Sequence, residues 1–575
     1  MIKKLLPCIG KYKKPALLTP VLVICEVILE IFIPLIMSKI IDVGIKNNDI
    51  AYVIKLGVMM IVMASLSLLA GALSGRFAAV ASAGFAKGVR KKLFDKIQEF
   101  SFANIDKFST ASLVTRLTTD VTNTQNAFQM IIRILVRAPI MLVSATIMAV
   151  SINARLAVIF LIAIPFLGTA LYLIAINAHP RFRAMLKKYD KMNLSVQENL
   201  TAIRVVKAFN RGSYEDEKFR LSAEELMEAQ RKAEKIVIFN MPVMQLTMYA
   251  CMIAISWFGG NMIIAGSMKT GEFMSFISYV TQILMSLMII SMVFIMVVLS
   301  RASAIRIAEV LDEEPDIKSN EESDDLSVED GSIIFHNVSF SYNKNKDNLV
   351  LENINFEIKS GETIGIIGGT GSAKTSLVQL IPRLYDVLCG KILVGGHDVR
   401  DYNLETLRNQ VAMVLQKNVL FSGTIKDNLK WGNENASDEE IEEACKSSQA
   451  HDFIMSFPDG YDTDLGQGGV NISGGQKQRI CIARALLKKP KIIILDDSTS
   501  AVDTATDSKI RQAFKDKLSG TTAVIIAQRI TSVCDADKII VLDEGKIDGI
   551  GTHDELLKNN NIYREVYESQ QKGED

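Results

Sequence analysis

The sequence predicts a two-part protein, an all-α domain of six transmembrane helices followed by an α/β domain. Two observations carry this prediction. Long apolar runs are confined to the first 300 or so residues, whereas short strand-like and helical segments alternate in the remainder. The chain is also 575 residues long with a mean hydropathy of +0.22, which is too long for one domain and too apolar for a wholly soluble protein.

Six apolar runs are each long enough for a membrane-spanning helix, which needs about 20 apolar residues. They cover residues 16–43, 52–82, 130–152, 155–178, 236–266 and 273–299. The N-terminus and the long connections 83–129 and 179–235 are rich in Lys and Arg, whereas the short connections are poor in positive charge. Because basic segments stay in the cytoplasm, we expect both termini and the long connections there. The long connections keep helical periodicity and predict helices that extend beyond the bilayer. A soluble helical bundle is the alternative, which the charge asymmetry disfavours.

Composition excludes several classes of protein. The formal net charge is zero, so no overall positive field argues for a nucleic-acid partner. The seven cysteines are scattered, odd in number and free of CxxC pairs, which argues against a disulfide framework or a zinc site and fits a reducing compartment. The N-terminus is basic and then apolar, as in a signal peptide. Five more long runs follow it, and we interpret it as a retained cytoplasmic end.

The composition changes after residue 311. The segment DEEPDIKSNEESDDLSVED is acidic and polar, and it predicts a solvated linker. We therefore expect a transmembrane domain at 1–311, a linker at 312–331 and a second domain at 332–575. In that second domain the segments SIIFHNVSFSY, TIGIIG, KIIILD, AVIIAQ and KIIVLDEG have the pattern of strands. Their alternation with helical segments predicts a parallel sheet with flanking helices.

A phosphate-binding loop follows the strand-like segment TIGII. Its sequence, GGTGSAKT, matches GxxxxGK[ST] except for an Ala at the last Gly position. Small residues let backbone N–H groups surround phosphates at the positive end of the next helix. The residues expected to hold the nucleotide are Gly368, Gly369, Thr370, Gly371, Ser372, Ala373, Lys374, Thr375 and Ser376. We expect Lys374 to contact the β- and γ-phosphates, and Thr375 to ligate Mg²⁺. Ala373 is expected to adopt helical dihedral angles with little harm.

Other motifs flank the loop in a recognisable order. Tyr342 lies on a strand-like segment upstream, Gln416 lies in VLQKNVLFSGTIKDNL, and residues 471–476 have the sequence NISGGQ. Asp496 then ends an apolar strand, shortly before SAVD at 500–503. This order resembles that of the ATP-binding cassette (ABC) family, and the resemblance covers essentially the whole chain, including the six preceding helices.

The resemblance implies a role for each motif at an ATP site. Tyr342 would stack on adenine, although an aromatic ring packed in the core is the alternative. Gln416 would contact Mg²⁺ and the attacking water, and Asp496 would hold Mg²⁺. Asp503 matches the family's D-loop, which crosses a dimer interface. The signature residues, which expose N–H groups to ATP held by the opposite cassette, are Ser473, Gly474, Gly475 and Gln476.

The chain is thus similar to a bacterial half-size ABC exporter, in which six helices are fused to one cassette. This likeness implies ATP and Mg²⁺ as cofactors, a place in the cytoplasmic membrane with the cassette inside the cell, and dimerisation of two halves. It also places the two coupling helices at Ser109–Leu113 and Asn210–Glu215. The implied function is ATP-driven export of hydrophobic or amphipathic compounds, drugs or lipids, by alternating access. Lipid flipping, peptide export and a regulatory sensor subunit that transports little stay open.

Two departures from the family pattern fall on catalytic elements. Asp497 stands where the family usually has the Glu that positions the attacking water, and Gln528 stands where it usually has a His at the γ-phosphate. A third, weaker departure is Gln467 in LGQGG. Neutral drift is one interpretation. The other is a degenerate site paired with a second half-transporter that keeps Glu and His, because Lys374 and the signature remain intact.

Two features of the apolar runs bear on the transported compound. Glu26 and Glu30 lie four residues apart and hence on one helix face, where they could attract cations or pair with polar groups between helices. Two methionine stripes could line a cavity that accepts varied apolar compounds, or they could simply pack between helices. They consist of Met241, Met244, Met248 and Met252, and of Met285, Met288, Met292 and Met296.

Overall fold

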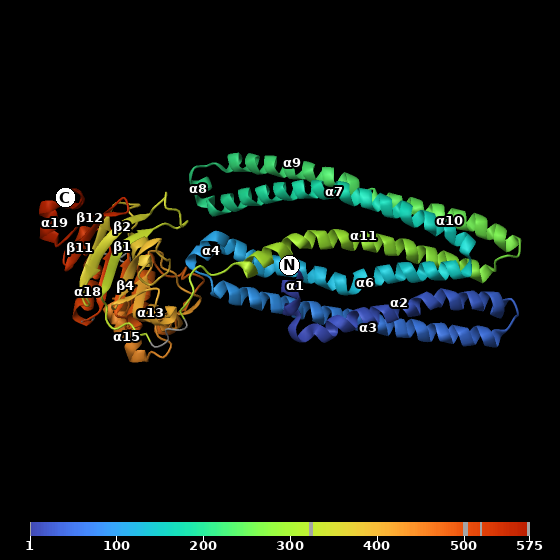
Figure 1. Cartoon of the computed structure of the whole chain (residues 1–575), viewed down its shortest axis with the longest axis horizontal. Helices are drawn as coiled ribbons and strands as arrows, with labels where there is room; N and C mark the ends of the chain where they lie inside the picture. The colour runs from blue at the N-terminus through green and yellow to red at the C-terminus, as the bar shows by residue number, and fades with distance from the viewer. Residues whose placement is uncertain (1, 321–325, 498–503, 518–519, 572–575) are drawn as a thin grey trace. The chain divides into compact units, whose positions relative to one another are not determined.

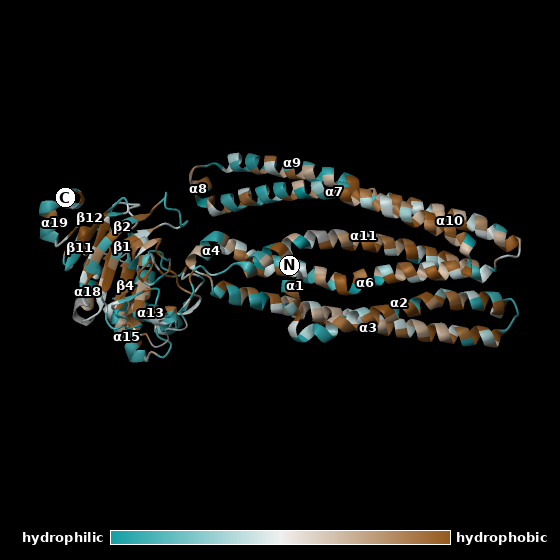
Figure 2. Ribbon diagram, viewed as in Figure 1, coloured by the Kyte–Doolittle hydropathy of each residue, from teal (hydrophilic) through white to brown (hydrophobic). Residues whose placement is uncertain are grey.

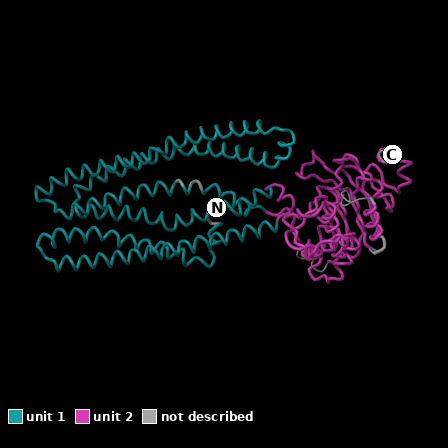
Figure 3. The backbone as a smooth tube through the Cα atoms, turned by 180° about the vertical axis from the view of Figure 1, so that it is seen from behind, with its two compact units in different colours: residues 1–99, 109–313 teal, residues 100–108, 314–575 magenta. Residues whose placement is uncertain are grey.

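The structure, a computed structural model, describes residues 2–320, 326–497, 504–517 and 520–571. It divides into two compact units, coloured separately in Figure 3. The first comprises residues 1–99 and 109–313, and the second comprises residues 314–575 together with residues 100–108. The short segment 100–108 therefore belongs to the C-terminal unit although it lies far from it in sequence.

The first unit is built of long helices, and six helices among the described residues are long and apolar enough to cross a membrane. Figure 2 shows their apolar residues concentrated along one part of each helix, with polar residues towards the α8 end of α7 and α9. The six are α2 (Lys13–Lys39), α3 (Ile50–Gln98), α6 (Val121–Ile152), α7 (Ala154–Thr201), α10 (Asn240–Ile264) and α11 (Thr270–Asp312). The other helical segments are α1 (Ile2–Leu5), η1 (Leu6–Tyr12), η2 (Ile40–Ile45), α5 (Thr110–Thr115), η3 (Arg116–Asp120), α8 (Ile203–Ala208) and α9 (Gly212–Val237). The prediction of six spanning helices is confirmed, as is the helical extension of the long connections.

The core of this unit lies between α2, α6, α7, α10 and α11. Within it the rings of Phe160 and Phe276 stack with centroids 5.0 Å apart, and the Tyr279 hydroxyl donates to the carbonyl of Ile31 at 2.7 Å. The last buried residue on α7 is Ala178, and beyond it α7 packs along α9 with exposed side chains. The first unit is therefore tightly packed at one end of α7 and loosely packed at the other.

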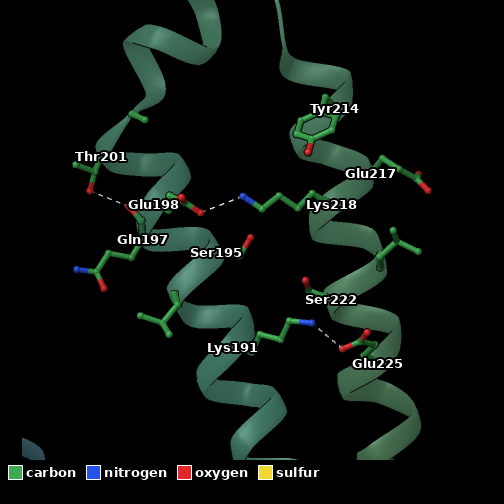
Figure 4. A pocket seen from close by; sticks show the side chains of 13 residues that line it. Lys191, Ser195, Gln197, Glu198, Thr201, Tyr214, Glu217, Lys218, Ser222 and Glu225 are labelled. Atoms are coloured by element: carbon green, nitrogen blue, oxygen red, sulfur yellow. Dashed lines mark hydrogen bonds and ion pairs between the residues drawn. The ribbon is translucent and has the colours of Figure 1, made fainter.

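The polar ends of α7 and α9 enclose a groove of about 1090 Å³ (Figure 4). Two ion pairs cross it: Lys218 Nζ lies 3.0 Å from a Glu198 carboxylate oxygen, and Lys191 Nζ lies 3.3 Å from one of Glu225. All four side chains are substantially exposed, so solvent screens both pairs and each adds little to stability. The two helices are consequently held together at this end by weak contacts.

A carboxylate in η2, the segment that directly follows α2, joins this segment to the start of α11. Asp42 Oδ1 accepts from the Gly271 N–H at 2.6 Å, and Asp42 Oδ2 accepts from the Glu272 N–H at 3.1 Å. A negative charge at the N-terminus of a helix is favourable because the first N–H groups have no partner within the helix. A side chain on Gly271 would collide with the carbonyl of Ser38, 2.4 Å away, so the close approach requires glycine.

The second unit contains two principal sheets. The six-stranded sheet has the order β12-β11-β3-β10-β9-β6, and its strand pairs are parallel except for β11 with the edge strand β12. Its strands are β3 (Thr363–Gly368), β6 (Val411–Val414), β9 (Ile492–Asp496), β10 (Thr522–Ile526), β11 (Lys538–Asp543) and β12 (Lys546–Gly551). Successive residues of β9 enter different cores, Ile493 and Leu495 one and Ile492 and Ile494 the other. Both faces of this sheet are therefore covered.

The second sheet is antiparallel, with the order β2-β1-β4-β5. Its strands are β1 (Ile333–Phe340), β2 (Leu351–Ile358), β4 (Cys389–Val394) and β5 (His397–Asp398). The sequence predicted one parallel sheet, which is confirmed for most of the expected strands and wrong for β1. The two kinds of strand differ in burial: β1 mixes buried and exposed residues, whereas every residue of β9 and β10 is buried, as expected in a covered parallel sheet.

Short helices surround these sheets and position the loops between the strands. They are α12 (Lys374–Gln379), α13 (Leu404–Gln410), α14 (Ile425–Lys430), α15 (Asp438–Ser447), α16 (His451–Met455), α17 (Gly474–Leu487), α18 (Thr504–Lys517), α19 (His553–Asn559) and α20 (Asn561–Gln571). The helix α4 (Phe102–Phe108) joins this unit. Figure 1 labels α13, α15, α18 and α19 around the strands of this unit.

Candidate nucleotide site and membrane charges

The candidate site lies at the carboxyl ends of four adjacent parallel strands. The phosphate loop follows β3, Gln528 follows β10, Asp496 ends β9, and Gln416 follows β6. Loops at this edge of a parallel sheet are where α/β proteins bind ligands. Four motifs that are far apart in sequence are thus brought to one edge of the sheet.

The phosphate loop is compact and depends on its glycines. A side chain on Gly368 would meet the carbonyl oxygen of Leu542 at 2.2 Å, and Gly371 has a φ of +88°, which disfavours other residues. Lys374 Nζ donates to the carbonyls of Gly368 and Gly369, at 2.8 Å in each case. Burial lowers the pKa of Lys374, whereas the nearby Asp496 and Asp497 carboxylates raise it. The loop thus holds its lysine at the mouth of the candidate phosphate site.

Ala373 corrects one expectation from the sequence. It was expected to take helical dihedral angles, but its φ is +69° and its ψ is 23°, which is the left-handed region. A residue with a Cβ atom pays about 1 kcal/mol or more there, because Cβ approaches the next carbonyl. The Gly that the loop motif usually has at this position would avoid that strain. Ala373 therefore strains the loop locally, directly before Lys374.

Thr375 and Asp496 form a site suited to Mg²⁺. The Thr375 hydroxyl donates to Asp496 Oδ1 at 3.1 Å, and Asp496 is only 1% exposed. Asp496 Oδ2 is buried and has no hydrogen-bond partner within the part of the chain that the structure describes. Burial raises the pKa of Asp496, and the adjacent Asp497 raises it further. Mg²⁺ prefers oxygen ligands and is usually held by one or two protein groups plus substrate phosphates, which fits this hydroxyl and carboxylate.

Asp497 and Gln528, the two residues that depart from the family's catalytic pattern, contact each other. Gln528 Nε2 donates to Asp497 Oδ2 at 2.7 Å. The backbone of Asp497 is also held, because its N–H donates to the Ile526 carbonyl at 3.1 Å and its carbonyl accepts from Gln478 Nε2 at 3.2 Å. Asp497 has a φ of +48° and is 8% exposed. The sequence placed both residues at the γ-phosphate but gave no sign that the amide of one would bind the carboxylate of the other.

The signature segment is ordered by a capping box at the start of α17. Ser473 Oγ accepts from the Gln476 N–H at 3.3 Å, and Gln476 Oε1 accepts from the Ser473 N–H at 2.8 Å. Nothing lies within 4 Å of the position that a Gly474 side chain would occupy, so the first turn of α17 is accessible there. The helix packs against α14, α15 and β6, whereas the phosphate-loop helix α12 packs against β3, β9 and β10. The two ATP-handling segments of this chain are thus supported by different elements.

Tyr342 lies beside the phosphate-loop helix. Its hydroxyl is 2.8 Å from Ser376 Oγ, and its side chain is partly exposed. Gln416 is exposed two residues beyond the end of β6. The D-loop, Ser500–Asp503, lies outside the described residues. Of the expected coupling helices, Ser109–Leu113 falls at the start of α5, and Asn210–Glu215 falls at the turn between α8 and α9.

Glu26 and Glu30 are paired with an arginine that the sequence search overlooked. Arg137 Nη2 donates to the two carboxylate oxygens of Glu30 at 2.9 and 2.7 Å, and Arg137 Nη1 contacts Glu26. Of the two alternatives, pairing between helices is the one that the structure shows. Arg137 could have been found from its place in the apolar run 130–152, because a charge at that depth needs a partner.

The methionine stripes divide between the core and exposed positions. Met244 is buried, and Met248 and Met288 pack against the same core. Met285 is exposed and lines a hollow of about 460 Å³ together with Glu30 and Arg137. Ordinary helix packing thus accounts for part of each stripe, whereas Met241 of the first stripe and Met285, Met292 and Met296 of the second remain exposed.

These features define a class of protein in which six membrane-spanning helices are fused to an ATP-binding cassette. Comparison with known families agrees. Residues 17–304 match the family model described as ABC transporter transmembrane region, and residues 351–500 match the one described as ABC transporter. The chain belongs to the ABC transporters, and its cassette is an ATPase domain whose hydrolysis of ATP is coupled to transport.

Several relatives match the chain over most of its length. The ABC transporter ATP-binding protein YfiB of Bacillus subtilis is 42% identical over 570 residues, covering 99% of this chain and 98% of YfiB. An ATP-dependent lipid A-core flippase of Syntrophus aciditrophicus is 34% identical, covering 84% of this chain and 80% of its own. The solved structure of a bacterial Atm1-family ABC exporter with ATP bound has a TM-score of 0.82 at 23% identity, covering 97% and 98% of the two chains. This last likeness confirms the exporter fold.

Proposed function

We propose that this chain is the degenerate-site half of a heterodimeric ABC exporter. The complex would move hydrophobic or amphipathic compounds across the bacterial cytoplasmic membrane by alternating access, with both termini and the cassette in the cytoplasm. The orientation is supported by the basic N-terminus and long connections, and by the polar ends of α7 and α9. The partner would be a second half-transporter that keeps Glu and His at the positions of Asp497 and Gln528.

The observation that carries this proposal is the hydrogen bond between Gln528 and Asp497. A carboxylate that positions or deprotonates water must direct an oxygen at that water. Asp497 is one methylene shorter than Glu, and Oδ2 is already occupied by the Gln528 amide. Gln528 in turn cannot carry the charge or the proton of a histidine. Both substitutions therefore act against hydrolysis at the same point.

The parts of the site that bind ATP are intact in the same chain. Lys374 is positioned to neutralise phosphate charge, and Tyr342 offers a partly exposed ring to the adenine. Thr375 and Asp496 would hold Mg²⁺, which supplies electrostatic stabilisation of the transferred phosphoryl group when bound. This combination favours a site that retains ATP and hydrolyses it slowly.

The capped signature helix supports the other half of the proposal. The N–H groups at the start of α17 form a positive helix end that suits a γ-phosphate. In an ABC dimer that phosphate belongs to ATP on the other subunit. Ser473 and Gln476 keep the first turn in order, so this chain is fitted to complete the site of its partner. An impaired own site and an intact contribution to the opposite site favour two different subunits.

The transported compound is constrained by the hollow beside Arg137. It is lined by apolar and small polar side chains, including Met141, Met285 and Ser286, with the paired Glu30 and Arg137 at its edge. Such a lining suits amphipathic molecules with an apolar body and a polar group. A lipid flippase is the second candidate, favoured by the relatives named ATP-dependent lipid A-core flippase. A sensor subunit that transports little is the third.

The test is to reconstitute the full-length chain in lipid, alone and together with the half-transporter that co-purifies with it. We expect slow ATP hydrolysis by the chain alone, and faster hydrolysis with ATP-dependent movement of amphipathic probes by the pair. Ordinary exporter rates from the chain alone would contradict the heterodimer proposal. A fluorescent phospholipid and a cationic dye, assayed in parallel, separate flippase from drug export. Hydrolysis by the pair with movement of neither probe would favour the sensor.

A further inference from the structure

The short helix α4 is fastened to the cassette unit by its polar side chains. Asn104 is buried, and its side-chain amide donates to the Glu314 carbonyl at 3.1 Å while its oxygen accepts from the Asp316 N–H at 3.3 Å. Asp316 also pairs with Lys344 at 3.1 Å. The segment 100–108 lies between two parts of the transmembrane unit in sequence but belongs to the cassette unit in space. Any displacement of α4 must therefore reach both flanking helices through the chain.

An aromatic cluster joins α4 to the candidate adenine site. The Tyr385 hydroxyl donates to Asp106 Oδ2 at 2.9 Å, and the Tyr385 ring lies 6.0 Å from that of Phe102. On its other side the Tyr385 ring meets the Tyr342 ring edge-on, with centroids 5.1 Å apart and an interplanar angle of 87°. Phe340 is buried, and its ring contacts both tyrosine rings, which holds the cluster in place.

We propose that Tyr385 is a positioning residue that links adenine binding at Tyr342 to the placement of α4. This inference rests on the proposed ATP site. Tyr342 is tied through its hydroxyl to Ser376, and adenine stacking would constrain its ring further. The Tyr385 ring, which packs edge-on against Tyr342, would be constrained with it, because such aromatic pairs depend on the relative orientation of the two rings. The Tyr385 hydroxyl then carries the constraint to Asp106 through a hydrogen bond to a charged acceptor, which is stronger than a neutral one.

The proton needed for this bond stays on Tyr385 at physiological pH. Burial raises the pKa of Tyr385, and the Asp106 carboxylate raises it further. The Tyr385 hydroxyl is therefore the donor and Asp106 Oδ2 the acceptor of this hydrogen bond.

The experiment is amide hydrogen exchange of the full-length protein in lipid nanodiscs, with and without MgATP. In the wild type we expect MgATP to slow exchange both at the phosphate loop and in α4. Tyr385→Phe keeps the ring and removes the hydroxyl, so it should leave the loop slowed by MgATP but abolish the slowing in α4, a change of about tenfold for one hydrogen bond to a charged group. Asp106→Asn keeps an acceptor but removes its charge, so it should preserve only part of the slowing in α4.

The matched control is Tyr402→Phe, which removes a buried hydroxyl that donates to the Val394 carbonyl at 2.7 Å in the same unit. It should leave the response of α4 to MgATP unchanged. If Tyr385→Phe speeds exchange in α4 equally with and without MgATP, the residue is merely structural and the inference is wrong. Unchanged slowing of α4 in Tyr385→Phe would also overturn it. If MgATP fails to slow the loop in the wild type, the proposed ATP site itself is wrong, and the inference fails with it.

Discussion

Restoring the two catalytic side chains tests whether the pair Asp497 and Gln528 limits hydrolysis. The variants are Asp497→Glu, Gln528→His and the two combined. The Asp carboxylate lies one carbon–carbon bond, about 1.5 Å, short of the place a Glu carboxylate would reach. A misplacement of about 1 Å can cost about 100-fold where geometry controls the reaction. Full restoration should therefore raise the rate of hydrolysis by about 100-fold.

The hydrogen bond between the two side chains makes their effects non-additive. In Asp497→Glu the amide of Gln528 can still bind the carboxylate, and a hydrogen bond to a charged group is worth about 1.5 kcal/mol or more. That energy corresponds to about tenfold in rate. We therefore expect about tenfold from Asp497→Glu alone, little from Gln528→His alone, and about 100-fold from the double variant.

The assay is phosphate release by the full-length chain in lipid nanodiscs, at saturating MgATP. The chain alone is suitable because a dimer of identical copies would combine its phosphate loop with its own ordered signature. Asp496→Asn, added to the double variant, is the control and should remove the gained activity. A double variant within threefold of the wild type would refute the reasoning. A full gain from Asp497→Glu alone would show that Gln528 does not restrain the carboxylate.

Three further results are expected. Arg137→Met leaves two carboxylates unpaired near the core, so it should lower the free energy of unfolding by about 3 kcal/mol or more and lower the melting temperature. Adding Glu26→Gln and Glu30→Gln to Arg137→Met should restore the melting temperature. Ala373→Gly should relieve about 1 kcal/mol of left-handed strain and raise the melting temperature of the cassette by about 2 °C, with Ala485→Gly in the helix α17 lowering it. Because burial raises the folded-state pKa of Asp496, its ionisation opposes folding above the ordinary aspartate pKa. Asp496→Asn should therefore raise stability at neutral pH without Mg²⁺, by a margin that shrinks as the pH falls. The same variant should abolish stabilisation by MgATP. Thermal unfolding at several pH values measures all three.

The sequence predicted the elements whose patterns are local. Apolar runs of sufficient length identified the six spanning helices, and small residues after a strand identified the phosphate loop. Asp496 and Thr375, which the sequence assigns to one site, contact each other because each ends or follows a strand of the same sheet. These predictions needed only periodicity, strand ends and loop chemistry, all of which can be recognised within a few residues.

The rest depended on contacts between distant residues. Nothing near Gln528 in sequence shows that its amide meets Asp497, and nothing near Tyr385 shows that its hydroxyl meets Asp106. The left-handed Ala373 was missed for a different reason: the expectation treated it as the start of a helix, whereas the loop imposes the conformation before the helix begins. Side-chain pairing and imposed backbone conformation are tertiary effects, and single-sequence patterns do not contain them.

The uneven packing of α7 has a mechanical consequence. The helix is buried only up to Ala178, and from there to Thr201 it extends for about 35 Å at 1.5 Å per residue. A rotation of 10° about the packed end would move the free end by about 6 Å, roughly one helical turn. The weak ion pairs to α9 would travel with it, since both helices lie on the same arm. The arm thus works as a lever, because a small rotation at its packed end becomes a displacement of several ångströms at its tip.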